Sequence, residues 1–217
     1  MRFLGVTLAA GLLWAGALAA QKNAAPFRPG AASSYPSHQK VGPAVIAAVK
    51  YESDSETKPL FGGKVNPNEY GVLPVLLIIQ NTGEDTLLLD RMQVLYQTPG
   101  GRNSVEPTDP KELPYLTGVR RPREAGAGGG IPSPIPLPRR KNPLTAIEFD
   151  SRAWGAKSIL KGEQAHGFLY FQTRHQRNAI LYISGIREAS TGKELFFAEV
   201  PVDPATPDEP ARNVGKM

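Results

Sequence analysis

Histidine and cysteine are the residue types that most often build metal sites and nucleophilic catalysts, and this chain has few of them. Of its 217 residues, 3 are His and none is Cys. The lack of Cys excludes a thiol nucleophile, a Cys-ligated zinc site and a disulfide framework. His38, His166 and His175 form no H-x-H or H-x-x-x-H pattern, the spacings that place two imidazoles on one metal. We therefore predict solvated histidines at strand ends, no metal and no other cofactor.

The serine and carboxylate patterns of hydrolases are also weak. The chain has no G-x-S-x-G motif, and Ser184 lies inside a predicted strand. A glycosidase-type mechanism needs two carboxyl groups at a fixed separation across the substrate. The candidate carboxylates all fall at predicted turns or on strand faces, where solvated charges are usual: Asp85, Asp90, Glu163, Glu188 and Glu194. We predict a non-enzymatic protein, with a hydrolase as an alternative that two coupled carboxylates in a cleft would support.

A glycine-rich segment at 126–130 invites comparison with a phosphate-binding loop. It is followed by Ile-Pro-Ser-Pro instead of the Gly-Lys-Ser and helix that such a loop requires. We therefore predict no phosphate site. The formal net charge of +5 is only mildly basic. It is compatible with weak attraction to an anionic surface and does not indicate nucleic-acid binding.

The most distinctive segment is a Pro-, Gly- and Arg-rich insertion at residues 107–143. Its prolines at 132, 134, 136 and 138 recur at every second residue, so one edge of an extended chain there would carry no N–H donors. One interpretation is a stiff spacer or blocked edge that prevents edge-to-edge association. The other is a recognition arm whose apolar side chains dock on a partner while its cations meet acidic groups. The residues of this predicted partner-binding site are Arg120, Arg121, Arg123, Ile131, Ile135, Leu137, Arg139, Arg140 and Lys141.

Aromatic side chains suggest a further alternative, a carbohydrate-binding module. Rings exposed on one face of a sheet would provide a surface on which sugars stack. Most rings of a sandwich are nevertheless expected in its core. The candidates are Tyr35, Tyr51, Tyr70, Tyr96, Tyr115, Tyr170, Tyr182 and Trp154.

Short apolar runs predict the strands that would position any such site. Residues 72–79 form an almost unbroken apolar run, which predicts a central strand buried on both faces. A polar turn at 80–85 and a returning strand at 86–89 follow it. We predict further strands at 41–51, 91–98, around Val105, and at 144–149, 167–171, 178–186 and 194–202. Close turn signals without an amphipathic helix are typical of an antiparallel β-sandwich.

The two ends of the chain differ in composition from this central part. Residues 1–20 combine Arg2, an apolar run and Ala17-Leu18-Ala19, which together are typical of a secretory signal peptide. An uncleaved anchor is the alternative. We predict a flexible leader at 21–40, a domain at 41–202 and a disordered tail at 203–217. The expected location is the periplasm or cell envelope, with no transmembrane segment once the signal is removed.

Two parts of the sequence resemble immunoglobulin-like domains. The run VLLIIQNTG at 75–83, followed by TLLL at 86–89, is similar to a core strand that ends at an Asn-x-Gly turn and returns with apolar residues. LKGE at 160–163 with GFLYF at 167–171 looks like the strand before the F–G hairpin. Over 41–202, without the insertion, the chain resembles the telokin-like domains of bacterial exported proteins. That family has no shared catalytic residues, and the Cys pair of antibody domains is absent here.

These expectations combine into one hypothesis about fold and function. The fold class is all-β, a single immunoglobulin-like antiparallel β-sandwich of about seven strands with a long Pro/Gly/Arg-rich insertion. The function is that of a non-enzymatic, exported binding or scaffolding module. Its expected partner is an envelope protein or an anionic envelope surface, and not nucleic acid.

Overall fold

The computed structural model describes residues 27–63, 65–101, 103–116 and 142–204. Over these ranges the chain is mostly β, with twelve short strands in three antiparallel sheets and two short α-helices. This confirms the predicted all-β class. The number of strands exceeds the expected seven mainly because five of the twelve have only two residues.

The largest sheet has five strands in the order β1-β2-β3-β9-β7. Their bounds are β1 His38–Val41, β2 Ala44–Lys50, β3 Leu73–Asn81, β9 Gln164–Phe171 and β7 Pro107–Thr108. The central strand β3 pairs over its length with β2 on one side and β9 on the other.

Two smaller sheets lie against one face of the largest one. The four-stranded sheet has the order β12 (Ala198–Pro201), β10 (Ile180–Ser184), β5 (Gln93–Gln97) and β6 (Ser104–Val105). The three-stranded sheet has the order β11 (Arg187–Glu188), β4 (Leu87–Leu88) and β8 (Ser158–Ile159). All three contribute to one apolar cluster, which is the interior of a two-layer β-structure.

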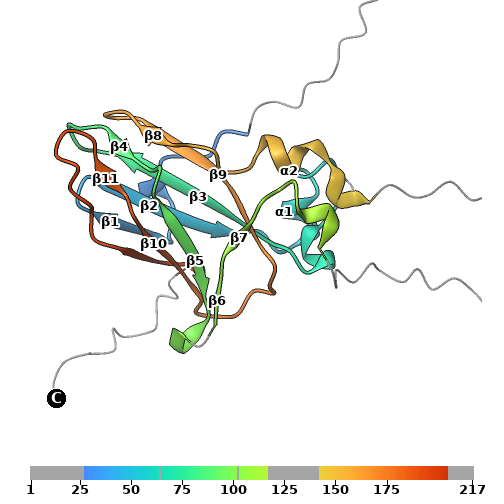
Figure 1. Cartoon of the computed structure of the whole chain (residues 1–217). Helices are drawn as coiled ribbons and strands as arrows, with labels where there is room; N and C mark the ends of the chain where they lie inside the picture. The colour runs from blue at the N-terminus through green and yellow to red at the C-terminus, as the bar shows by residue number, and fades with distance from the viewer. Residues whose placement is uncertain (1–26, 64, 102, 117–141, 205–217) are drawn as a thin grey trace, which may run out of the picture.

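The other face of the largest sheet is covered by short helices and loops. The helices are α1 Asp54–Thr57 and α2 Ile147–Ser151, which Figure 1 places together at one end of the sheets. The 3₁₀ segments on this side are Ala32–Ser34, Pro67–Tyr70, Leu113–Tyr115 and Pro143–Thr145, and a fifth, Pro99–Gly101, lies in the turn between β5 and β6. A capping box between Ser53 and Glu56 begins α1.

The alternation of β3 explains why its sequence is apolar throughout. Leu77 and Ile79 belong to the cluster between the sheets, whereas Leu76 and Ile78 belong to the cluster beneath the helices. Phe61 and Phe149 stack there with ring centroids 4.7 Å apart. The prediction of a central strand buried on both faces is therefore confirmed.

Three local predictions differ from the structure. Residues 41–51 are divided because Gly42, with φ of 55°, turns the chain between β1 and β2. Residues 144–149 are helical and not a strand, because Asn142 caps the turn that Pro143 begins. In the segment predicted as a leader, Ala32 is buried and β1 pairs with β2.

The described parts of the chain contain no helix that is both long enough and apolar enough to cross a bilayer.

The pairing of residues 93–97 with their neighbours confirms the predicted strand near 91–98, and its inward residues Val94 and Tyr96 are buried.

Candidate functional site

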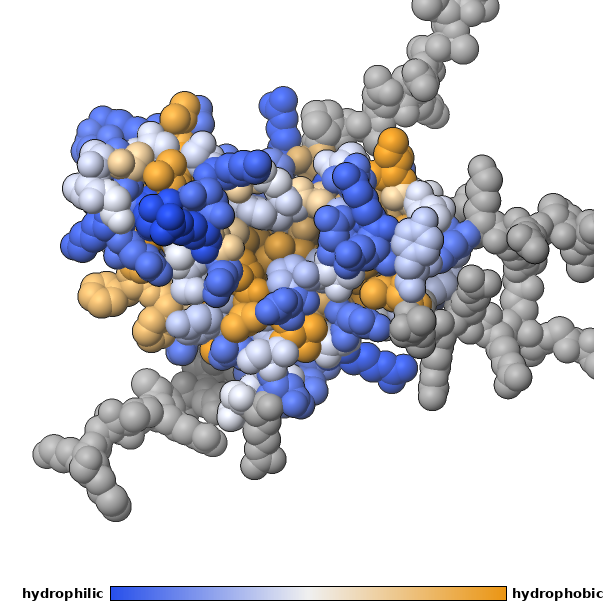
Figure 2. Space-filling view, in the orientation of Figure 1, coloured by the Kyte–Doolittle hydropathy of each residue, from blue (hydrophilic) through white to orange (hydrophobic). Residues whose placement is uncertain are grey.

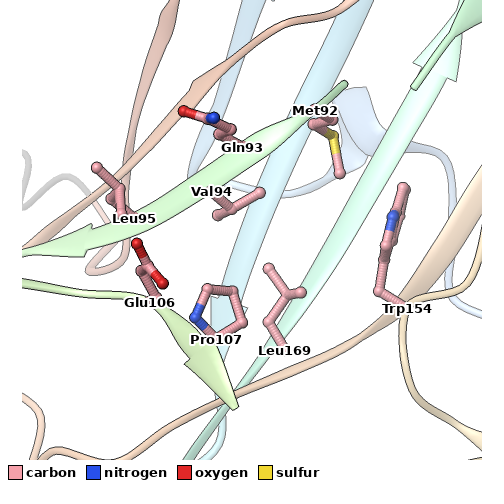
Figure 3. Close-up of a pocket in the computed structure, with 8 residues that line it drawn as sticks. All are labelled: Met92, Gln93, Val94, Leu95, Glu106, Pro107, Trp154 and Leu169. Atoms are coloured by element: carbon pink, nitrogen blue, oxygen red, sulfur yellow. The ribbon is translucent and has the colours of Figure 1, made fainter. Parts of the chain in front are cut away.

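A hollow of about 470 Å³ opens between the five-stranded and four-stranded sheets, along β5. Figure 2 shows hydrophobic atoms in a recess near the middle of that view. In Figure 3, Met92 and Val94 face Leu169 and Trp154 across this space. The remaining lining residues are Gln93, Leu95, Glu106 and Pro107. Cavities of roughly 300–1,000 Å³ with mostly apolar walls and a few polar groups are usual for ligand sites.

The hollow exists because the strand beside β5 stops early. β6 pairs only with Tyr96 and Gln97 of β5. The Thr98 amide donates to the Asn103 carbonyl, so on β5 the N–H groups of Thr98, Tyr96 and Val94 point to this side. If the β5–β6 pairing continued in the same register, residue 107 would be the partner of Val94. That residue is Pro107, which has no N–H and pairs with Phe171 in the other sheet.

The chain therefore crosses from one sheet to the other at Glu106. Among the described residues, no strand pairs with the edge of β5 that Val94 presents. This open edge is one residue long, because the Met92 N–H donates to Leu89 and Tyr96 pairs with Val105. Unpaired strand groups can pair with another extended chain. The hollow and the open edge adjoin, since Val94 belongs to both.

The far wall of the hollow depends on a glycine in β9. Trp154 donates its backbone N–H to the Phe168 carbonyl, and the Phe168 N–H donates to the Arg152 carbonyl. The segment after α2 therefore pairs with β9 through a parallel bridge. A Cβ added to Gly167 would lie 2.5 Å from the Trp154 Cα. Only glycine allows this close approach, which holds Trp154 at the edge of the core.

The lining has a mixed but simple chemistry. Its apolar side chains would receive an aliphatic or aromatic group, while the Gln93 amide points away from the hollow (Figure 3). Glu106 is the one carboxylate among the described residues that line it. A basic group on the ligand would complement this carboxylate.

The predicted partner-binding residues lie outside the described residues. All nine of them, from Arg120 to Lys141, fall within 117–141, so the insertion remains a sequence-based prediction. The sequence analysis did not identify the hollow. Two features of the sequence could have indicated the hollow: Gly167 inside an apolar strand, and Pro107 two residues after Val105.

The three histidines occupy different environments. His38 and His166 are exposed, as predicted, and their ring nitrogens lie 2.6 Å from the Tyr35 carbonyl and 3.2 Å from the Phe27 carbonyl. The prediction is wrong for His175, whose side chain is only 7% exposed. The loop that follows β9 folds over the end of the sheets and carries this ring inward.

His175 is the centre of a hydrogen-bonded network. The Gln176 amide donates to the Tyr96 hydroxyl at 2.9 Å, and this hydroxyl is hydrogen-bonded to Nδ1 of His175 at 3.1 Å. Nε2 of the same ring lies 2.9 Å from the Asp203 carboxylate.

Asp203 also receives hydrogen bonds from two other elements. The Lys50 ammonium lies 3.0 Å from its Oδ1, and the Asn178 amide donates to its Oδ2 at 2.8 Å. Burial opposes ionisation, but these hydrogen bonds and nearby charges outweigh it and lower the pKa of Asp203. Burial raises the pKa of Tyr96. The network thus joins β2, β5, the 172–179 loop and the end of β12.

The candidate carboxylates of a hydrolase are distributed over separate turns. Asp85 accepts hydrogen bonds from Ser190, and both carboxylate oxygens of Asp90 accept from Nη2 of Arg187. These contacts lower the pKa of both carboxyls, whereas a general acid needs a raised pKa. Glu188 and Glu194 bond to Thr191 and to the Gly185 amide. No group of three metal-ligating side chains occurs in the described part of the chain.

Comparison of the chain with protein-family models, with curated proteins and with solved structures gives no match of any of the three kinds. The immunoglobulin-like resemblance therefore stays a prediction from the sequence.

Proposed function

We propose that the chain is a non-enzymatic, exported binding module that holds an extended segment of an envelope protein along β5. The observation that carries this proposal is the unpaired edge of β5 beside an apolar hollow. In strand addition, backbone hydrogen bonds supply affinity and side-chain pockets supply specificity. Val94 provides the backbone groups, and the hollow provides the pocket.

The preferred segment follows from the lining. An extended peptide beside Val94 places every second side chain toward the interior, where Met92, Trp154 and Leu169 surround it. Full burial of one Leu, Ile or Phe side chain is worth about 1.5–3 kcal/mol. Glu106 at the crossing favours a Lys or Arg beside that apolar residue.

Envelope location and the finer fold belong to the same proposal. The signal-like residues 1–20 and the absence of Cys support export. The two apposed antiparallel layers support an immunoglobulin-like sandwich. The basic insertion at 107–143 would add a salt-sensitive contact with acidic groups of the partner or of an anionic envelope surface.

The peptide site is tested with a phage-displayed library of random dodecapeptides selected on the purified chain. Selected peptides are then titrated against the wild-type chain, Met92→Trp and Gln97→Trp. The Met92 side chain points into the hollow (Figure 3), whereas Gln97 lies on the outward face of β5 and does not line it. We expect Met92→Trp to weaken binding at least tenfold because the indole fills the hollow, while Gln97→Trp changes it less than about twofold.

The expected peptides share an apolar residue next to a Lys or Arg. Selection of no peptide, or of peptides that bind both tryptophan variants like the wild type, would contradict the proposed site. Thermal unfolding of each variant provides the control for folding.

A further inference from the structure

The outward face of the four-stranded sheet is a second surface, on the side of β5 and β10 away from the core. Strand alternation turns Val94, Tyr96, Leu181 and Ile183 inward, where they are buried. The outward side chains are Gln93, Leu95, Gln97, Ile180, Tyr182, Ser184, Glu199 and Pro201. One of these eight is charged, and none is Lys or Arg.

Aromatic rings form one border of this face. Tyr182 and Phe197 stack with centroids 5.3 Å apart and an interplanar angle of 26°. Phe197 is 51% exposed and its neighbour Phe196 is 87% exposed. Figure 2 shows hydrophobic atoms projecting at the left of the molecule, near the red end of the chain in Figure 1. Contiguous exposed apolar side chains rimmed by polar residues are typical of binding surfaces.

We propose that this face binds a neutral oligosaccharide. A sugar ring presents C–H groups on its faces, which pack on aromatic rings, and hydroxyl groups at its edges. The Tyr182–Phe197 pair supplies the ring surface. Gln93, Gln97 and Ser184 each supply both a donor and an acceptor, as hydroxyl groups require.

The register aligns these groups across the sheet. Tyr182 pairs with Leu95 on one side and with Glu199 on the other. The rows above and below pair Ile180 with Gln97, and Ser184 with Gln93. The polar groups therefore lie on β5 and at the end of β10, around the tyrosine ring.

The charge of the face argues for a neutral ligand. A surface that docks on anionic lipid carries Lys or Arg beside its aromatic residues, whereas the charged side chain here is Glu199. A second copy of the chain packed on this face would bury the amide groups of Gln93 and Gln97. A hydroxyl-rich ligand satisfies those amides.

This face and the interior of the hollow lie on opposite sides of β5, and Gln93 and Leu95 border both. The face is tested by isothermal titration of the purified chain with cellohexaose and chitohexaose. The variants are Phe197→Ala and Tyr182→Ala, with Phe196→Ala as a milder change at a more exposed ring. Tyr115→Ala is the matched control, because Tyr115 is 82% exposed and lies outside this face. We expect saturable binding of at least one oligosaccharide, weakened at least tenfold by Phe197→Ala and unchanged by Tyr115→Ala or by 0.5 M NaCl.

The proposal is overturned if neither sugar binds or if Phe197→Ala binds as well as the wild type. It is also overturned if the same rings instead drive binding to phosphatidylglycerol vesicles, or dimer formation in sedimentation. Tyr182 and Phe197 do not line the hollow, so peptide binding should survive both substitutions.

Discussion

At the residue scale, the His175 network shows how a loop is fixed without a disulfide. Tyr96, His175 and Asp203 are connected by two hydrogen bonds, and the Lys50 ammonium contacts the same carboxylate oxygen, Oδ1, as His175 does. Hydrogen bonds that involve charged groups contribute about 1.5–3 kcal/mol each. The sequence predicted a solvated His175 because this residue follows a strand end and belongs to no metal-binding pattern. Its partners come from distant strands, which sequence spacing does not reveal.

Replacement of Asp203 tests this network through its pH dependence. The folded pKa of Asp203 lies below the ordinary 3.8. Its ionised form therefore stabilises the fold above that pH, and the stabilisation is lost as pH falls through the lower folded value. We expect Asp203→Asn to reduce the free energy of unfolding by about 1.5–3 kcal/mol at pH 7. The difference from the wild type should shrink below about pH 4.

Urea unfolding at pH 7, 5, 4 and 2.5 measures this difference. Glu163→Gln is the control, because Glu163 is exposed at a turn, and it should change stability by less than about 0.5 kcal/mol. A difference between Asp203→Asn and wild type that stays constant down to pH 2.5 would show that the carboxylate charge is not what stabilises the loop.

At the scale of elements, two residues without functional groups shape the candidate site. Pro107 ends the β5–β6 ladder because it has no N–H and pairs in the other sheet. Gly167 lets the Trp154 backbone lie on β9. The sequence predicted the strands on both sides of the hollow. The hollow itself forms where pairing along β5 ends and the chain crosses to the other sheet, and the position of that crossing depends on contacts between the sheets.

Gly167→Ala should therefore displace one wall of the hollow. The added Cβ would meet the Trp154 Cα and N at 2.5 and 2.7 Å, and overpacking of this kind costs about 1–3 kcal/mol. Gly155→Ala is the matched control, since nothing lies within 4 Å of a Cβ at that position. Urea unfolding gives the stability, and the Trp154 indole N–H signal in ¹H–¹⁵N NMR spectra reports its environment. Equal effects of the two substitutions would contradict the role given to Gly167.

The residues before 144–149 explain why this segment is helical and not the predicted strand. The apolar residues of 144–149 predict a short strand, and in the structure Leu144 and Phe149 are buried as parts of helical turns. Asn142 and Pro143 before them are start signals for a helix, and they determine the conformation. Short apolar runs do not distinguish a strand from a buried helical turn, so the residues before the run decide.

At the scale of the whole molecule, the fold has a central sheet covered on both faces. The apolar sequence of β3 predicted that both faces are buried, and this was the strongest inference that the sequence allowed. The covering layers were not predicted in full, because α1 and α2 have four and five residues and give no helical periodicity. One face of the molecule carries the open edge of β5, and the adjoining sheet face carries the aromatic pair.

The most direct test of the open edge at β5 is hydrogen exchange of individual backbone amides, measured by NMR on the intact chain. The Val94 N–H points to the open edge, whereas the Leu95 N–H points to β10, with which β5 pairs along its length. We predict that Val94 exchanges at least 100-fold faster than Leu95 and Tyr96, and that a selected peptide slows it. Equal protection of Val94 and Leu95 in the free chain would show that the edge is already paired and would contradict the proposed binding site.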